Sequence, residues 1–108
     1  MPHCILEYSG NVVDEPDWAA TLAALHRVLA ATGLFVLDDI KSRVVRQGDF
    51  LVGDGRSDRA FVALEIQILS GRPDDEVAAL LDRSSLLPFT DKTICDRTAI
   101  LMRIAAAR

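Results

Sequence analysis

The sequence predicts an α+β domain with the element order βαββαβ, in which a four-stranded mixed sheet carries two helices on one face. Three observations predict it: runs of alternating apolar and polar residues, two stretches with helical periodicity, and a Gly- and Asp-rich loop between two strand–helix–strand units. The 108 residues fit a single domain, 1–108. Its parts are a first unit (2–46), a connecting loop (47–58) and a second, shortened unit (59–106).

The first unit reads as a strand, a helix and a strand. HCILEYS at 3–9 alternates as a partly buried strand does. A helix is predicted over 17–32, with Asp17 as its N-cap and Gly33 as its left-handed stop. Its apolar stripe recurs every three or four residues, at Trp18, Leu22, Leu25, Leu29 and Thr32. The second strand is predicted at 39–46.

The second unit repeats this order with shorter parts. RAFVALEIQIL at 59–69 is the clearest strand in the chain, because every second residue is apolar. A helix is predicted over 73–83, with acidic residues in its first turn, and a last strand over 98–106. The connection 84–97 is predicted to be a loop. Both helices cover one face of the sheet, so we expect oligomerisation to cover the other.

Composition and charge exclude several classes of function. The net charge of −4 and the lack of a Lys/Arg cluster disfavour nucleic-acid binding. No stretch approaches the roughly 20 apolar residues of a membrane helix, and no signal peptide is recognisable. Cys4 and Cys95 have no zinc-site spacing and are expected to be reduced residues of the core. These features favour a cytoplasmic enzyme or binding module.

The residue with the most distinctive chemistry is Pro2. If Met1 is removed, Pro2 presents a secondary amine, and ordinary α-amino groups have a pKa of about 8. A general base must be unprotonated at neutral pH, so burial and nearby cations would have to lower that value. The alternative is an inert N-terminus, since most chains that begin Met-Pro carry no chemistry there.

Three cations could accompany such an amine. Lys41 and Arg43 lie two residues apart and so share one face of the second strand. Arg72 lies at a strand-to-helix junction, where a guanidinium and free backbone N–H groups can bind a carboxylate. The alternatives are a solvated strand edge for the first two and a surface ion pair with Asp74 or Asp75 for Arg72.

Three segments of the chain together resemble a known family. PHCILEYSGN, LAATGLFVLDDIKSRV and DRAFVALEIQILSGR resemble the 5-carboxymethyl-2-hydroxymuconate isomerases of the tautomerase superfamily, over residues 2–72. The resemblance implies a tautomerase-like βαββαβ subunit, a homotrimer, and no metal or organic cofactor. It also implies a role in the breakdown of homoprotocatechuate, on a small polycarboxylate substrate.

The resemblance further implies a role for each candidate residue. Pro2 would be the base that takes a proton from the substrate's 2-hydroxyl group and returns one to carbon, which converts a dienol into its conjugated ketone. Arg72 would hold a substrate carboxylate, and Lys41 stands where the family commonly has an active-site arginine. Arg43 matches an arginine of the SRV motif and is grouped with the substrate-binding cations, with its role left open.

The chain also departs from the family pattern. The part after Arg72 is short, and Lys41 keeps the charge of an arginine but loses its bidentate fork. Two hypotheses follow: an active isomerase, or a tautomerase-fold oligomer that has lost its activity and acts in binding or structure. A decarboxylase or dehalogenase that uses the same proline lies between them.

Overall fold

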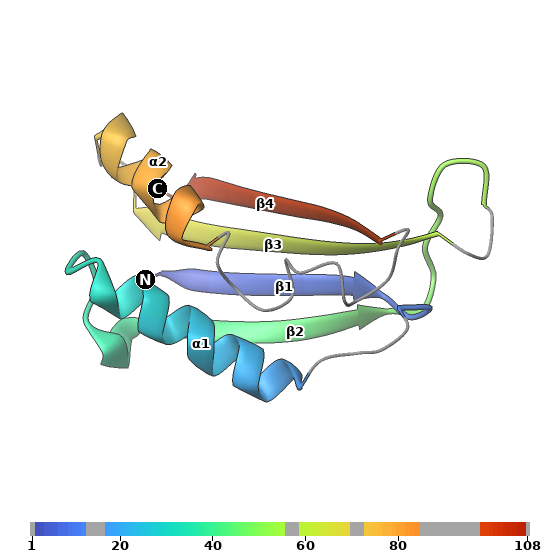
Figure 1. Ribbon diagram of the computed structural model, residues 1–108, viewed down its shortest axis with the longest axis horizontal. Coiled ribbons are helices and arrows are strands. Elements are labelled where there is room, and N and C mark those ends of the chain that lie inside the picture. Colours follow the sequence, from blue (N-terminus) through green and yellow to red (C-terminus); the bar gives the residue numbers. More distant parts are fainter. Residues whose placement is uncertain (1, 13–16, 56–58, 70–72, 85–97, 108) are drawn as a thin grey trace.

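The computed structural model describes residues 2–12, 17–55, 59–69, 73–84 and 98–107 (Figure 1). The elements in chain order are β1 (His3–Ser9), α1 (Trp18–Ala31), the 3-10 turn η1 (Leu37–Asp39), β2 (Lys41–Gln47), β3 (Ala60–Leu69), α2 (Asp74–Ser84) and β4 (Thr98–Ala107). The strands lie in the order β2-β1-β3-β4. β1 is parallel to β2 and antiparallel to β3, and β3 is parallel to β4. Figure 1 shows both helices on one face, which confirms the predicted α+β class and mixed sheet.

The first helix begins and ends where the sequence predicts. An Oδ atom of Asp17 accepts a hydrogen bond from the N–H of Ala20 at 3.2 Å, which caps the N-terminus of α1. At the other end Gly33 has φ 76°, a left-handed conformation that glycine adopts without steric cost. The cap and the glycine therefore delimit the helix within one residue of the prediction.

The second strand begins two residues later than predicted, at Lys41 rather than residue 39. The N–H groups of Asp39 and Ile40 donate to the carbonyls of Val36 and Leu37, at 3.0 and 3.1 Å. These bonds close the η1 turn, so the backbone is curled there and cannot join the ladder with β1. The predicted start at 39 was wrong because local turn bonds outcompete strand pairing at this position.

The core lies between the sheet and the two helices. Its buried apolar members are Cys4, Leu6, Tyr8, Val12, Leu25, Leu29, Ile40, Ala60, Val62, Leu64, Ile66, Ile68 and Leu80. The inward face predicted for the strand at 59–69 is thus buried throughout. In α1, Leu25 and Leu29 are buried as predicted, whereas Trp18 is half-buried and stacks on Tyr8 with the ring centroids 4.7 Å apart. Thr21 is buried although it lies outside the predicted stripe, because its hydroxyl donates to the carbonyl of Asp17 at 3.1 Å.

The second unit also follows the prediction closely. α2 spans Asp74–Ser84 against the predicted 73–83, and β4 spans Thr98–Ala107 against the predicted 98–106. The predicted loop lies almost wholly outside the described residues, as does Cys95. Among the described residues no helix is both long enough and apolar enough to cross a bilayer.

Leu25→Ala should destabilise the fold by about 2–5 kcal/mol, because it removes a fully buried side chain from the core and leaves a cavity. The matched control is Leu37→Ala, since the Leu37 side chain is 54% exposed and its truncation should change the free energy of unfolding by less than about 1 kcal/mol. Urea denaturation followed by circular dichroism measures both. Equal losses in the two variants would contradict the core assignment of α1.

The thiol of Cys4 should be unreactive in the folded chain. Burial raises the pKa of this thiol to about 12 from an ordinary value of 9.0, because an apolar surrounding penalises the thiolate. Between pH 9 and 12 the unfolded chain would lose this proton while the folded chain keeps it, so stability should fall as the pH rises through that window.

Iodoacetamide labelling, with Cys4 located by peptide mass spectrometry, tests this expectation. At pH 8 the native chain should be labelled at Cys4 at least about a hundredfold more slowly than the urea-unfolded chain. Comparable rates in the two states would show that the thiol is accessible and would contradict its place in the core.

Candidate active site

Pro2 lies directly before β1, which is one of the two central strands of the sheet. Its side chain is fully buried, and its carbonyl oxygen accepts a hydrogen bond from the backbone N–H of Lys41 at 3.1 Å. This bond extends the parallel ladder of β1 and β2 by one residue, since the next pair in register is His3 with Lys41. The ladder therefore holds the backbone of the candidate base at a defined position.

Lys41 is the cation that the structure brings next to Pro2. Its side chain is exposed, and its Nζ atom donates to the carbonyl oxygen of Asp39 at 3.3 Å. This acceptor is a neutral backbone group, so the ammonium charge is not cancelled by it. Lys41 can therefore present a positive charge to an anionic ligand at this end of the sheet.

Arg43 lies on the same face of β2 as Lys41, but farther from Pro2. Its register partner on β1 is Ile5. Two residues of extended strand separate it from Lys41, which is a distance of about 6.6 Å at 3.3 Å per residue. The structure thus brings Pro2 and Lys41 together and places Arg43 one pleat farther along the sheet.

Arg72 lies outside the described residues, and so does Met1. The elements on either side of Arg72 in the sequence are described. β3 ends at Leu69, and because β3 is antiparallel to β1, with His3 opposite Gln67, its end lies beside the start of β1. The chain therefore leaves β3 at the edge of the sheet where Pro2 lies.

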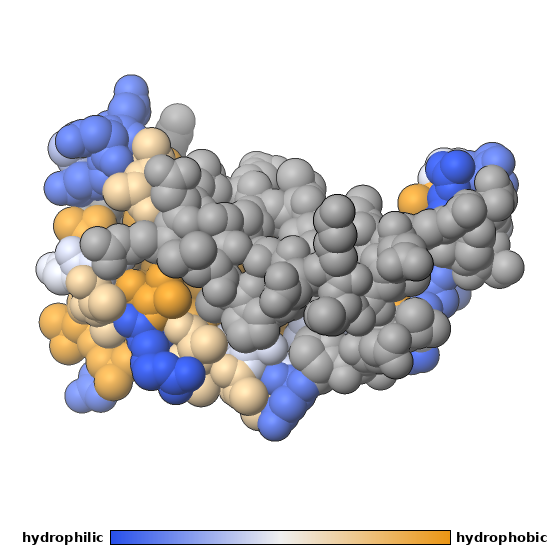
Figure 2. Space-filling model, in the orientation of Figure 1, coloured by the Kyte–Doolittle hydropathy of each residue, from blue (hydrophilic) through white to orange (hydrophobic). Residues whose placement is uncertain are grey.

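The segment before β2 exposes both apolar and acidic side chains near the Pro2 end of the sheet. Figure 2 shows hydrophobic side chains gathered where α1 ends and η1 follows. Val36 and Leu37, at 65% and 54% exposed, belong to this segment, and the neighbouring Ile40 is buried. Asp38 and Asp39 are exposed in the same turn, so this surface combines apolar side chains with negative charge.

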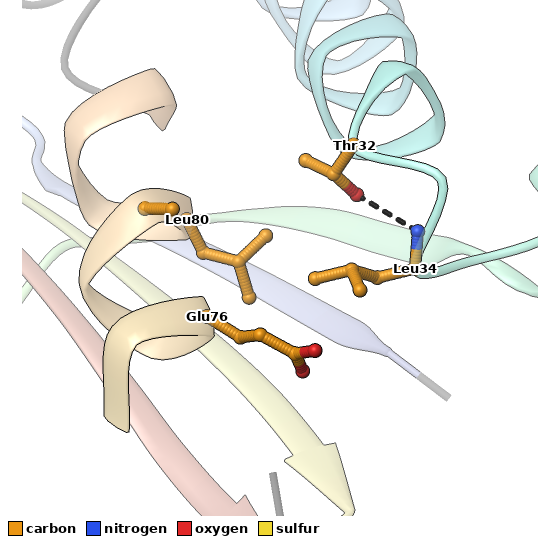
Figure 3. Close-up of a pocket in the computed structure, with 5 residues that line it drawn as sticks. Thr32, Leu34, Glu76 and Leu80 are labelled. Carbon is orange, nitrogen blue, oxygen red and sulfur yellow. Dashed lines mark hydrogen bonds between the residues drawn. The ribbon is translucent and has the colours of Figure 1, made fainter. Parts of the chain in front are cut away.

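A cavity of about 160 Å³ opens between the end of α1 and the first turns of α2 (Figure 3). It is lined by Thr32, Leu34, Glu76, Ala79 and Leu80. The carboxylate of Glu76 is directed toward Leu34, and the Oγ1 atom of Thr32 accepts from the N–H of Leu34 at 3.2 Å. A carboxylate in the wall would repel an anionic substrate, so this cavity is ill suited to bind a substrate carboxylate.

Two further features bear on the choice of site. The half-buried His26 shares a 2.7 Å hydrogen bond between its Nε2 atom and the Oγ atom of Ser42, which ties α1 to β2 on the helix side of the sheet. The contact gives the imidazole of His26 a structural role. Within the described ranges, no three His, Cys, Asp or Glu side chains are arranged so that they could hold a metal ion.

Sequence comparison connects the chain with one family. The pattern of the family described as 5-carboxymethyl-2-hydroxymuconate isomerase matches residues 2–93. The 5-carboxymethyl-2-hydroxymuconate Delta-isomerase of Escherichia coli is 40% identical over 72 residues. These residues make up 67% of this chain and 57% of the E. coli protein, so the match spans little more than half of that relative.

Comparison with solved structures supports the same relationship. The crystal structure of a 5-carboxymethyl-2-hydroxymuconate isomerase from Deinococcus radiodurans R1 matches with a TM-score of 0.69 and 29% identity, covering 99% of this chain and 83% of that one. A fused 4-OT protein, described as a wild-type symmetric trimer, matches in fold with a TM-score of 0.65 and 14% identity, covering 97% of this chain and 86% of that one. The family pattern covers most of the chain, and the chain belongs to the 5-carboxymethyl-2-hydroxymuconate isomerase family of the tautomerase superfamily.

Proposed function

We propose that the protein is an isomerase that converts a 2-hydroxymuconate-type dienol carboxylate, such as 5-carboxymethyl-2-hydroxymuconate, into its conjugated keto isomer. The observation that carries the proposal is the position of Pro2, fully buried and bonded through its carbonyl to Lys41 at the start of two parallel strands. The family relationship supplies the reaction type. In this proposal Met1 is removed, so that Pro2 is the first residue.

The proposed reaction moves one proton and conserves all atoms. The Pro2 amine accepts the proton of the substrate's 2-hydroxyl group, and the resulting enolate delocalises over the diene. The protonated amine then donates a proton to carbon, which yields the conjugated ketone and restores the free base. One group that serves first as base and then as acid is sufficient for this tautomerisation.

The surroundings of Pro2 favour the free amine. An ammonium group is destabilised by burial, which favours the free amine. Pro2 is fully buried, and its carbonyl oxygen is bonded to the backbone of Lys41, which supports a base at a fixed and water-poor position. A substrate carboxylate near Lys41 would be attracted by the positive charge of its side chain.

We assign the binding of a substrate carboxylate to Lys41, and propose Arg72 as a second binding residue. The assignment of Lys41 is supported by its exposed ammonium group. The proposal for Arg72 is based on its match to the family arginine and on the position at which β3 ends. The ligand is a small polycarboxylate, for which two cations near one base are appropriate. We propose no nucleic-acid or membrane partner.

We further propose that the protein is a homotrimer. The sheet face opposite the helices lacks a covering layer among the described residues, and a fold neighbour of this chain is itself described as a symmetric trimer. A second layer formed by other copies would bury the half-exposed apolar residues of that face. A role in the breakdown of homoprotocatechuate, and a place in the cytoplasm, belong to the same proposal and rest on the family relationship.

Pro2→Ala should lower kcat by about a hundredfold or more for ketonisation of a 2-hydroxymuconate-type substrate. The variant replaces a ring-fixed secondary amine by a primary amine on a mobile residue, and general base catalysis is worth about 10²–10⁴-fold. In the wild-type protein the rate should fall as the pH is lowered, because a protonated amine cannot accept the hydroxyl proton. The ultraviolet absorbance of the substrate measures the rate of the variant and the pH dependence of the wild type.

Intact-mass spectrometry accompanies this assay, so that each preparation is known to have lost or kept Met1. Arg27→Ala is the control, because Arg27 is exposed on α1 and should leave the rate unchanged. A chain that retains Met1 and is fully active would contradict the proline mechanism. If neither the wild type nor Pro2→Ala were active, the result would favour the alternative, an oligomer that acts in binding or structure without catalysis.

Lys41→Ala should lower kcat/KM by about 10- to 100-fold, since a hydrogen bond to a charged group contributes about 1.5–3 kcal/mol. The backbone bond to Pro2 survives this substitution because it uses the main-chain N–H, so the loss would report the side chain alone. Lys41→Arg should retain or improve kcat/KM, because a guanidinium can bind a carboxylate through two donors. Steady-state kinetics measure both variants. A kcat/KM of Lys41→Ala equal to that of the wild type would contradict the assignment.

A further inference from the structure

A row of three polar side chains crosses the sheet next to Pro2. His3 follows Pro2 directly on β1, and its register partners are Lys41 on β2 and Gln67 on β3. Partners in register project from the same face of a sheet, and neighbouring strands lie about 4.8 Å apart. The three side chains therefore lie side by side on the face opposite the helices, at the margin where β1 and β2 begin.

The imidazole of His3 is the group in this row that the fold leaves without a contact. Its side chain is half-buried, and across the described ranges it makes neither a hydrogen bond nor an ion pair. The Nε2 atom of Gln67, by contrast, donates to the Oε1 atom of Glu65 at 2.9 Å. An imidazole carries at least one N–H donor in either protonation state. A half-buried donor is stabilised by an acceptor, so His3 is suited to a ligand that brings one.

The charges around His3 favour an anionic ligand. Lys41 is its neighbour on β2, and the acceptor of the Lys41 ammonium is the neutral carbonyl oxygen of Asp39 at 3.3 Å. The carboxylate of Glu65 lies one pleat farther along the sheet and is bonded to Gln67. The Lys41 and His3 part of the row therefore offers N–H donors and a positive charge, which suit a carboxylate.

Two donors on adjacent strands do what one lysine cannot do alone. An ammonium group is a point charge on a flexible stem, so it attracts a carboxylate without fixing its direction, whereas a planar guanidinium binds both oxygens. The imidazole of His3 projects from the next strand, about 4.8 Å from the base of the Lys41 side chain. It can supply the second point of contact for the same carboxylate.

We infer that His3 is a substrate-binding residue, whose imidazole N–H and the Lys41 ammonium hold one and the same carboxylate of the substrate. The inference rests on the proposed function and deepens it, because it names the second contact of the carboxylate assigned to Lys41. The held carboxylate is unchanged by the reaction, so the contact contributes equally to the bound substrate and to the transition state. Its loss therefore raises KM and changes kcat little.

Steady-state kinetics with a 2-hydroxymuconate-type substrate test this role. His3→Ala should raise KM about tenfold and leave kcat within about threefold, because a hydrogen bond to a charged group is lost. His3→Gln keeps an N–H donor and should bring KM back to within about threefold of the wild type. His26→Gln is the matched control: it makes the same change at the other, half-buried histidine, which lies on the helix side, and should leave KM unchanged.

A second measurement uses muconate, a dicarboxylate that lacks the 2-hydroxyl group and so binds without reacting. By titration calorimetry its Kd should rise about tenfold in His3→Ala and at least as much in Lys41→Ala. The double variant should bind less than about threefold more weakly than Lys41→Ala, because both residues contact one carboxylate and their effects are not additive. Losses that multiply would assign the two residues to different carboxylates and overturn the inference.

Far-UV circular dichroism and light scattering check the fold and the association state of each variant. The inference is also overturned if His3→Ala equals His26→Gln in KM and in muconate affinity, or if His3→Ala changes association while muconate still binds as in the wild type. The calorimetry separates this inference from the proposed function. An inactive wild type that binds muconate about tenfold more tightly than His3→Ala would remove the isomerase and leave the carboxylate site in place.

Discussion

The pairing of β1 on both of its sides is the constraint on which the rest of the structure depends. β1 pairs with β2 in parallel and with β3 in antiparallel orientation. Its side chains therefore alternate between the face of the sheet that the helices cover and the face opposite to it. Cys4, Leu6 and Tyr8 face the helices and enter the core, whereas His3, Ile5 and Glu7 face away from them. A register slip of one residue would exchange these two sets, and it would also detach Pro2 from Lys41. The core, the candidate site and the uncovered sheet face therefore share one register.

The elements that could be predicted are those with strong local signals. The strand at 59–69 alternates without interruption, and the helix after Asp17 has both a capping side chain and a closing glycine. The start of β2 could not be predicted in this way, because the residues before Lys41 form an η1 turn whose backbone bonds leave no mark in the hydrophobic pattern. The burial of Thr21 could not be predicted from the hydrophobic pattern either, since it depends on a hydrogen bond from the hydroxyl to a backbone carbonyl.

Only the part of the candidate site that depends on the order and direction of the strands could be predicted from the sequence. The nearness of Pro2 and Lys41 follows from two parallel strands that begin at the same edge of the sheet, an arrangement the element order already predicts. The difference between Lys41 and Arg43 does not follow from it, because a shared strand face says nothing about which residue lies next to Pro2. The cavity at Glu76 required the packing of α1 against α2, two helices that are distant in the sequence.

The burial of Pro2 has a consequence for the proposed removal of Met1. An aminopeptidase must draw the first residues of its substrate into its own active site in extended form. In the folded chain Pro2 is fully buried, and its carbonyl oxygen is bonded to β2. In the proposed mechanism, cleavage of the bond before Pro2 would therefore precede the pairing of β1 with its neighbours. A molecule whose sheet closed first would then keep Met1 and lack the proline amine that the proposal requires.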